Sequence, residues 1–125
     1  MAITSAIATS FKQQILVEGH NLTQGADTIK LALYTSSASL GAATTAYATT
    51  NEVSGTNYTA AGGSLTNVTP STSGTTAICD FADFTFSTAT VTARGCLIYN
   101  SSNAGKAIAA IDFGGDKTST AGDFT

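Results

Sequence analysis

Ionisable side chains are scarce in this chain of 125 residues. Charged residues make up 10% of the sequence, whereas an average soluble domain has about 25%. The chain contains two glutamates, one arginine and one histidine, and it has no tryptophan. Active sites and metal centres are assembled from ionisable side chains, so this shortage disfavours an enzyme and predicts neither a cofactor nor a metal site.

The net charge of −3 and the isoelectric point near 4.7 give no electrostatic basis for binding nucleic acid, which requires clustered lysine or arginine. The basic residues are instead scattered, at Lys12, Lys30, Arg94, Lys106 and Lys117. No apolar run approaches the length of a transmembrane helix, so we expect no membrane partner. The first ten residues lack the charged and apolar regions of a signal peptide, which predicts folding in a cytoplasm.

Small hydroxyl residues and alanine take the place of the missing charges. Threonine and serine account for 36 of the 125 residues, and 21 of the hydrophobic residues are alanines. So few large apolar side chains predict a thin core, such as one sheet covered on one face or a small sandwich. Charge-poor surfaces are also typical of proteins that pack against other subunits. The alternative is that threonine is abundant here only because it favours strands.

One helix is predicted, near the amino terminus. Ile3, Ile7, Phe11 and Ile15 recur every four residues and would form one apolar face. The helix would begin near Thr4 or at Ser10 and end at residue 18, before a glycine. It is too short to be stable alone, so we expect it to pack on a sheet.

The rest of the chain has the period of strands. Ile29, Leu31 and Leu33 alternate with Lys30, Ala32 and Tyr34, which predicts a strand with two distinct faces. Residues 35–50 are expected to form a long loop, and residues 100–105 a turn that joins two strands into a hairpin. The other predicted strands are residues 65–68, 77–86, 89–93, 96–99 and 106–113, with glycines 114 and 115 ending the last. We therefore predict one mainly β, or α+β, domain over residues 1–125, with a short helix on an antiparallel sheet or small β-sandwich.

Residues with catalytic potential have no partners at suitable spacing. The single histidine, His20, is expected to be a structural residue near the end of the helix. Cys79 and Cys96 are predicted to be buried thiols in strands, with pairing left open. Asp80 and Asp83 would point to opposite faces of a strand, so they form no carboxylate pair.

Four aromatic side chains are the candidate interface anchors. The tyrosines are too dispersed, and too far from basic residues, to form a surface that stacks nucleic-acid bases. Aromatic side chains are instead enriched at the centres of protein interfaces. The selected anchors are Tyr34, Tyr47, Tyr58 and Phe84.

Several segments together resemble a family of small structural proteins from the virions of tailed bacteriophages. The likeness follows chain order over residues 10–16, 29–40, 46–63, 92–100 and 110–119. It implies a virion protein without enzymatic activity, and it supplies no functional residues. Members of the family usually continue beyond the final Asp-Phe-Thr into another strand. Either the present sequence is truncated, or a neighbouring subunit provides the missing edge strand.

The resemblance and the composition together predict a capsid decoration, or cement, protein that binds the outer shell. Its partners would be the major capsid protein or other virion subunits and further copies of itself, and its location would be the virion. One alternative is a tail or neck subunit, such as an adaptor, a tube protein or a fibre base. Another is a module that binds host glycans, which would require exposed aromatic residues with aspartate or asparagine at a common loop end. Asp80, Asp83 and Tyr58 could serve only if folding gathers them.

Overall fold

The computed structural model describes residues 2–17 and 19–125. The fold is mainly β, with 52% of the residues in strands and 6% in a helix, which confirms the predicted class. The described elements are β1 (Ala6–Ile7), α1 (Thr9–Ile15), β2 (Ile29–Tyr34), β3 (Gly63–Ser64), β4 (Asn67–Ser73), β5 (Thr76–Phe81), β6 (Phe86–Asn100) and β7 (Lys106–Phe124).

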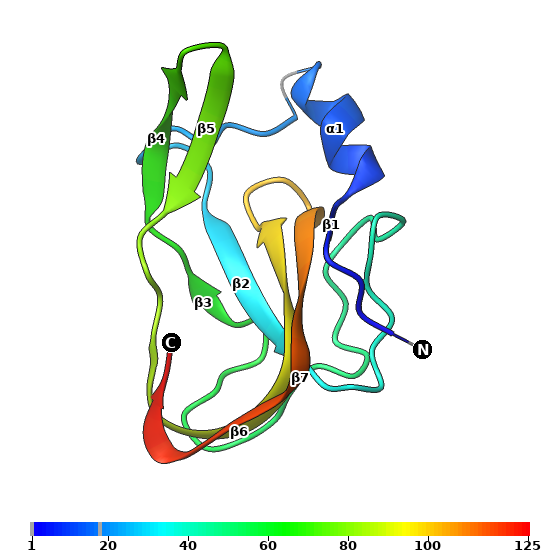
Figure 1. Cartoon of the computed structure of the whole chain (residues 1–125), viewed down its shortest axis with the longest axis vertical. Coiled ribbons are helices and arrows are strands. Elements are labelled where there is room, and N and C mark those ends of the chain that lie inside the picture. The colour runs from blue at the N-terminus through cyan, green and yellow to red at the C-terminus, as the bar shows by residue number, and fades with distance from the viewer. Residues whose placement is uncertain (1, 18) are drawn as a thin grey trace.

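Five strands form one antiparallel sheet in the order β1-β7-β6-β2-β3 (Figure 1). Its centre is the hairpin of β6 and β7, which begins where Asn100 pairs with Lys106. The turn between them is the predicted one, and it needs positive φ angles at Ala104 (+54°) and Gly105 (+68°). Glycine adopts this conformation without steric cost, so the sequence places a glycine where the turn closes.

A bulge interrupts β7 midway along this hairpin. Ala93 pairs with Lys117, but Gly95 pairs with Asp112, so residues 113–116 face a single residue of β6. The Asp112 carboxylate stabilises the bulge, because its Oδ1 accepts hydrogen bonds from the Gly114 N–H (2.9 Å) and from Arg94 Nε (3.2 Å). The prediction that the strand ends at glycines 114 and 115 is therefore wrong, since β7 continues to Phe124.

The strand pair bends strongly beyond β2, and its distal half sweeps across the bottom of the view in Figure 1. Bulges are the usual cause of such bending.

The core of the protein lies on both faces of the sheet. One cluster contains Ala32, Tyr34, Leu97, Tyr99 and Ala107, and a second, within the bend, contains Leu33, Val53, Tyr58, Phe86, Ala89, Val91, Ala93 and Cys96. The predicted alternation along β2 is confirmed, because Leu33 and its neighbours enter different clusters.

The amino-terminal segment differs from the prediction. Ile3 is buried beside Leu40, and Ala6 and Ile7 form a strand against β7, so the helix begins only at Thr9. The spacing of four residues between Ile3 and Ile7 predicted a helix, but this segment pairs with other parts of the sheet instead, because tertiary contacts override helix propensity. In an extended chain the same spacing lets each isoleucine contact a different neighbour. The helix ends at Ile15, and its predicted last residue, at position 18, lies outside the described residues. Phe11 packs against the first core cluster.

Strands β4 and β5 form a separate two-stranded hairpin (Figure 1). Nearly every residue of this hairpin is exposed, including Val68 (46%) and Ile78 (43%). The predicted single strand over residues 77–86 is thus two strands, β5 and the start of β6, separated by residues 82–85. The apolar side chains of this stretch suggested a core strand, but only Phe86 is buried in the core, and Phe84 packs against it half-buried.

Candidate functional site

A carboxylate surrounded by tyrosines holds residues 47–61 against the sheet. Glu52 accepts hydrogen bonds from the Tyr47 hydroxyl (2.5 Å), the Tyr58 hydroxyl (2.5 Å) and the Ala61 backbone N–H (2.8 Å). The Tyr58 oxygen in turn accepts a hydrogen bond from the Leu33 N–H of β2 (2.9 Å). These contacts join one of the two glutamates of the chain to the centre of the sheet.

The remaining two tyrosines bind backbone carbonyls of the same segment. The Tyr34 hydroxyl donates to the Ala48 carbonyl (2.6 Å), and the Tyr99 hydroxyl donates to the Ala61 carbonyl (2.6 Å). The rings of Tyr47 and Tyr99 stack with their centroids 4.7 Å apart. All four tyrosine hydroxyls therefore donate to oxygens within residues 48–61. We call these four tyrosines and Glu52 the tyrosine–Glu52 cluster.

The cluster is suited to a structural role. Burial raises the pKa of Tyr34 to about 12. Burial, followed by the hydrogen bond to Glu52, raises the pKa of Tyr47 and of Tyr58 still further. The hydroxyls consequently stay protonated as donors at physiological pH, and none is available as a tyrosinate base or nucleophile.

Two of the four predicted interface anchors are buried in the core, and the other two are half-buried. Tyr34 and Tyr58 are only 2% and 8% exposed, so in this chain they are core residues and not surface anchors. Their rings fill the two core clusters while their hydroxyls are bound internally, a combination that the sequence pattern did not indicate. Tyr47 and Phe84 are half-buried, and Phe84 packs edge-on against Phe86 with the centroids 4.9 Å apart.

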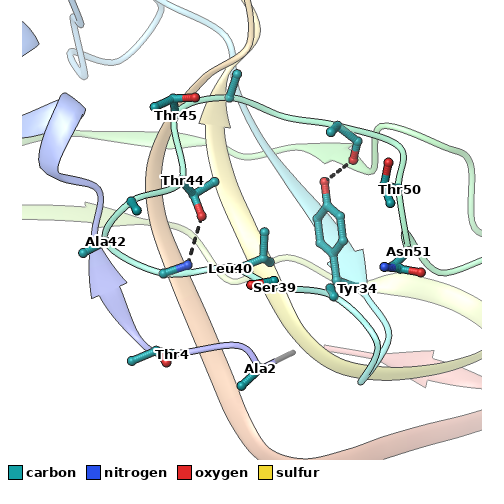
Figure 2. A pocket seen from close by; sticks show the side chains of 15 residues that line it. Ala2, Thr4, Tyr34, Ser39, Leu40, Ala42, Thr44, Thr45, Thr50 and Asn51 are labelled. Atoms are coloured by element: carbon teal, nitrogen blue, oxygen red, sulfur yellow. Dashed lines mark hydrogen bonds between the residues drawn. The ribbon is translucent and has the colours of Figure 1, made fainter.

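A groove of about 740 Å³ lies beside this cluster, between the amino-terminal segment and residues 38–51 (Figure 2). Tyr34 stands at its inner wall, with its hydroxyl turned to the loop. The Thr44 hydroxyl accepts a hydrogen bond from the Gly41 N–H (2.9 Å) and so fixes the turn on the opposite wall. The other lining residues are Ala2, Thr4, Ala38, Ser39, Leu40, Ala42, Ala43, Thr45, Ala46, Ala48, Thr50 and Asn51.

None of the residues described in the lining of this groove carries a charged side chain. Among the described lining residues the only ionisable group is the Tyr34 hydroxyl, which is already hydrogen-bonded, so these residues offer no free acid or base for a reaction. Alanine and glycine lose no side-chain freedom when they are covered, and the short serine and threonine side chains lose little. The groove is therefore chemically suited to packing against another protein surface.

His20 belongs to a hydrogen-bonded group that joins residues 19–28 to the β6–β7 turn. The side-chain nitrogen of Asn100, which is 0% exposed, donates to Asp27 Oδ2 (2.7 Å) and lies 3.1 Å from His20 Nδ1. His20 Nε2 lies 2.7 Å from Gln14 Oε1, so a neutral imidazole protonated at Nε2 satisfies both contacts. Burial lowers the pKa of His20, which favours this neutral form. The predicted structural role thus holds, although not as a cation beside a helix end.

The two cysteines have different surroundings. Cys96 is 1% exposed in the second core cluster, as predicted, but Cys79 is exposed, because β5 lies in the separate hairpin. Both thiols are free, and no disulfide joins them.

The carboxylates of residues 80 and 83 are not brought beside an exposed aromatic site. Asp80 lies on β5 opposite Val68, whereas Asp83 lies beyond the strand, and both are exposed while Tyr58 is buried. Within residues 2–17 and 19–125, no three histidine, cysteine, aspartate or glutamate side chains gather as metal ligands would. The described part of the chain also holds no helix with the length and apolar composition that a bilayer crossing needs.

Comparison of the chain with protein-family models, with curated proteins and with solved structures finds no match.

Proposed function

We propose that this protein is a structural subunit of a tailed-phage particle and, specifically, a capsid decoration protein that binds the outer face of the shell. The observation that carries the proposal is the uncharged groove of Figure 2. Its described lining is mostly alanine, serine and threonine, which offers shape and hydrogen-bonding capacity without a charged side chain. The resemblance of the sequence to small virion proteins supplies the particular setting.

The surroundings of the groove support a docking role. The tyrosine–Glu52 cluster fixes residues 47–61, and the Tyr34 hydroxyl ties Ala48 to the sheet, so one wall is ordered before any partner binds. A preorganised surface avoids the entropy cost of ordering a loop on binding. Many copies on a repeating lattice would then stabilise the shell by mass action, since each bound copy favours the assembled state.

The first experiment is quantitative mass spectrometry of purified particles from the phage that encodes this chain. A decoration protein is expected in hundreds of copies per particle. A copy number of about a dozen or fewer would place the protein in a ring at the neck or tail. Absence from the particles would refute both structural assignments, and specific binding of the free protein to a glycan array would favour the host-attachment alternative.

A second experiment tests the groove itself. Ala43 is exposed in the groove, so Ala43→Glu introduces a charge there without disturbing the core. The matched control is Ala26→Glu, which introduces the same charge at an exposed alanine outside the groove. Each variant is added back to particles produced without the gene. We expect Ala43→Glu to raise the dissociation constant about tenfold or more, because it buries an unpaired charge, and Ala26→Glu to leave it unchanged. Equal binding by the two variants would show that the groove is not the docking surface.

A further inference from the structure

The β4–β5 hairpin has one protected edge and one open edge. On β4, Pro70 lies in a bulge between Val68 and Ser71, and a proline cannot donate a hydrogen bond to an added strand. The loop before β2 also approaches this strand, because the Gln24 N–H donates to Thr69 Oγ1 (3.1 Å). Proline, bulges and covering loops are the devices by which proteins protect sheet edges. As far as the described residues show, no proline, bulge or covering loop protects the outer edge of β5.

The turn of the hairpin defines which backbone groups of β5 point outward. Ser73 pairs with Thr76 across a two-residue turn, and Gly74 has the positive φ (+60°) that a type II′ turn requires at its first central position. The closing pair of such a turn is hydrogen-bonded, and bonded and non-bonded pairs then alternate along the strand. The N–H and C=O groups of Ala77 and Cys79 therefore point away from β4. At Phe81, the next outward position, the N–H already donates to Asp80 Oδ1 (2.8 Å).

The exposed apolar side chains lie on one face of this hairpin. Val68 pairs with Asp80, and Ile78 is two residues from Asp80 on β5, so Val68 and Ile78 are diagonal neighbours on the same face. Both side chains are more than two-fifths exposed. A two-stranded hairpin with open faces is marginally stable by itself, and additional strands would stabilise it.

We propose that β5 pairs with β5 of a second copy of this chain, antiparallel and about a two-fold axis at Ile78. In this register the two Ile78 side chains face each other, and Ala77 of each copy exchanges backbone hydrogen bonds with Cys79 of the other. Thr76 then lies opposite Asp80 of the second copy, so the two aspartates stay apart. The hairpins become a four-stranded sheet with Val68 and Ile78 of both copies in one apolar strip.

The composition of β5 selects this register. A two-fold axis one residue further on, at Cys79, would also align the outward-pointing backbone groups. It would, however, place Ile78 opposite Asp80 of the second copy, so that an apolar side chain would face a carboxylate and the isoleucines would be separated. With the axis at Ile78, the two isoleucine side chains face each other, and the Asp80 carboxylate of each copy faces the Thr76 hydroxyl of the other. Pairing about a two-fold axis also gives a closed dimer, because the contact covers the open β5 edge of both copies and leaves none for a third copy.

The contact is a single strand pair, so it is smaller than a standard protein interface and is expected to be weak in free solution. It becomes effective where copies are held close together, because tethering raises the local concentration. The pairing does not depend on the groove, and the two surfaces can be tested separately.

Disulfide trapping tests the register. Residues 78 of the two copies would form a non-hydrogen-bonded pair with Cα atoms about 4.5 Å apart, which is within the range that a disulfide spans. In a Cys79→Ser background, Ile78→Cys should yield a covalent dimer under mild oxidation. Thr72→Cys in the same background is the matched control, because Thr72 is also exposed but lies on β4, away from the axis. Cys96 is buried and does not interfere. Equal dimer yields from the two variants, or none from Ile78→Cys, would overturn the proposal.

Sedimentation equilibrium at protein concentrations up to about 1 mM tests the association without a covalent link. The wild-type chain should self-associate. Ile78→Lys should abolish the association, because it sets two lysines directly opposite each other. Thr76→Lys adds the same charge two residues away, but opposite Asp80 of the second copy, and should strengthen it. Circular dichroism verifies that both variants remain folded. A monomeric wild-type chain, or equal effects of the two lysines, would refute the pairing, whatever the outcome of the particle-binding experiments.

Discussion

Replacing Glu52 with alanine should destabilise the fold more than any other change to a polar side chain outside the core. The substitution removes the acceptor for the Tyr47 and Tyr58 hydroxyls and for the Ala61 N–H, which lie 2.5, 2.5 and 2.8 Å from the carboxylate. Hydrogen bonds to a charged group contribute about 1.5–3 kcal/mol each. Bonds that share one partner do not add fully, and Glu52 is partly exposed, so we expect a loss of about 3–4 kcal/mol.

Equilibrium unfolding in urea measures this loss, which should also lower the melting temperature by about 12–16 °C. Glu52→Gln keeps one acceptor oxygen and should cost about half as much. Asp116→Ala removes an exposed carboxylate and should change stability by less than about 0.5 kcal/mol. Hydrogen exchange at the Ala61 N–H gives a local readout, since its protection should fall in Glu52→Ala. A loss below about 1 kcal/mol, with Ala61 still protected, would refute the view that the tyrosine–Glu52 cluster holds this segment.

Three further predictions concern single groups. Cys79 should react rapidly with a thiol reagent in the folded chain, whereas Cys96, buried and with its pKa raised to about 12, should react only on unfolding, as timed labelling will show. Gly62→Ala should unfold the protein at 25 °C or nearly so, because the new Cβ would lie 1.8 Å from the Leu31 carbonyl oxygen; Gly25→Ala, with a similar φ but open space, should cost about 1 kcal/mol in the same urea assay. Because the pKa of His20 is lowered on folding from 6.5, the unfolded chain binds the proton more tightly, so stability should fall as pH drops below about 6.5, and His20→Gln should flatten that slope.

Local sequence patterns correctly predicted the elements whose structure depends on residues close together in the sequence. The alternation along β2 follows the two core clusters, and Asn100 to Gly105 form the predicted turn, because strand period and turn chemistry are properties of short stretches. The helix was predicted too long, since the pairing of Ile3 with Leu40 and of Ala6 with Ala110 depends on residues far away in sequence.

The site depended on the same kind of distant contact. Tyr34 and Tyr58 were selected as surface anchors from residue type alone, and only the folded chain shows their hydroxyls bound inside it. One signal was present in the sequence: Glu52, in a chain with two glutamates, lies five residues after one tyrosine and six before another. A rare carboxylate so close to phenol donors is a candidate acceptor. The exposed β4–β5 hairpin had no such signal, because its apolar side chains resemble those of a core strand.

The order of strands in the main sheet has a consequence for synthesis. β1 is made before β7 and pairs with it, and β7 is also the long partner of β6. Until β7 is made, β1 lacks its partner strand, and β6 has only β2 beside it in the sheet. Contacts between residues so distant in sequence slow folding, since the loop between them must close first. We therefore expect the nascent chain to remain largely unfolded until β7 emerges, and to depend on chaperones during that interval.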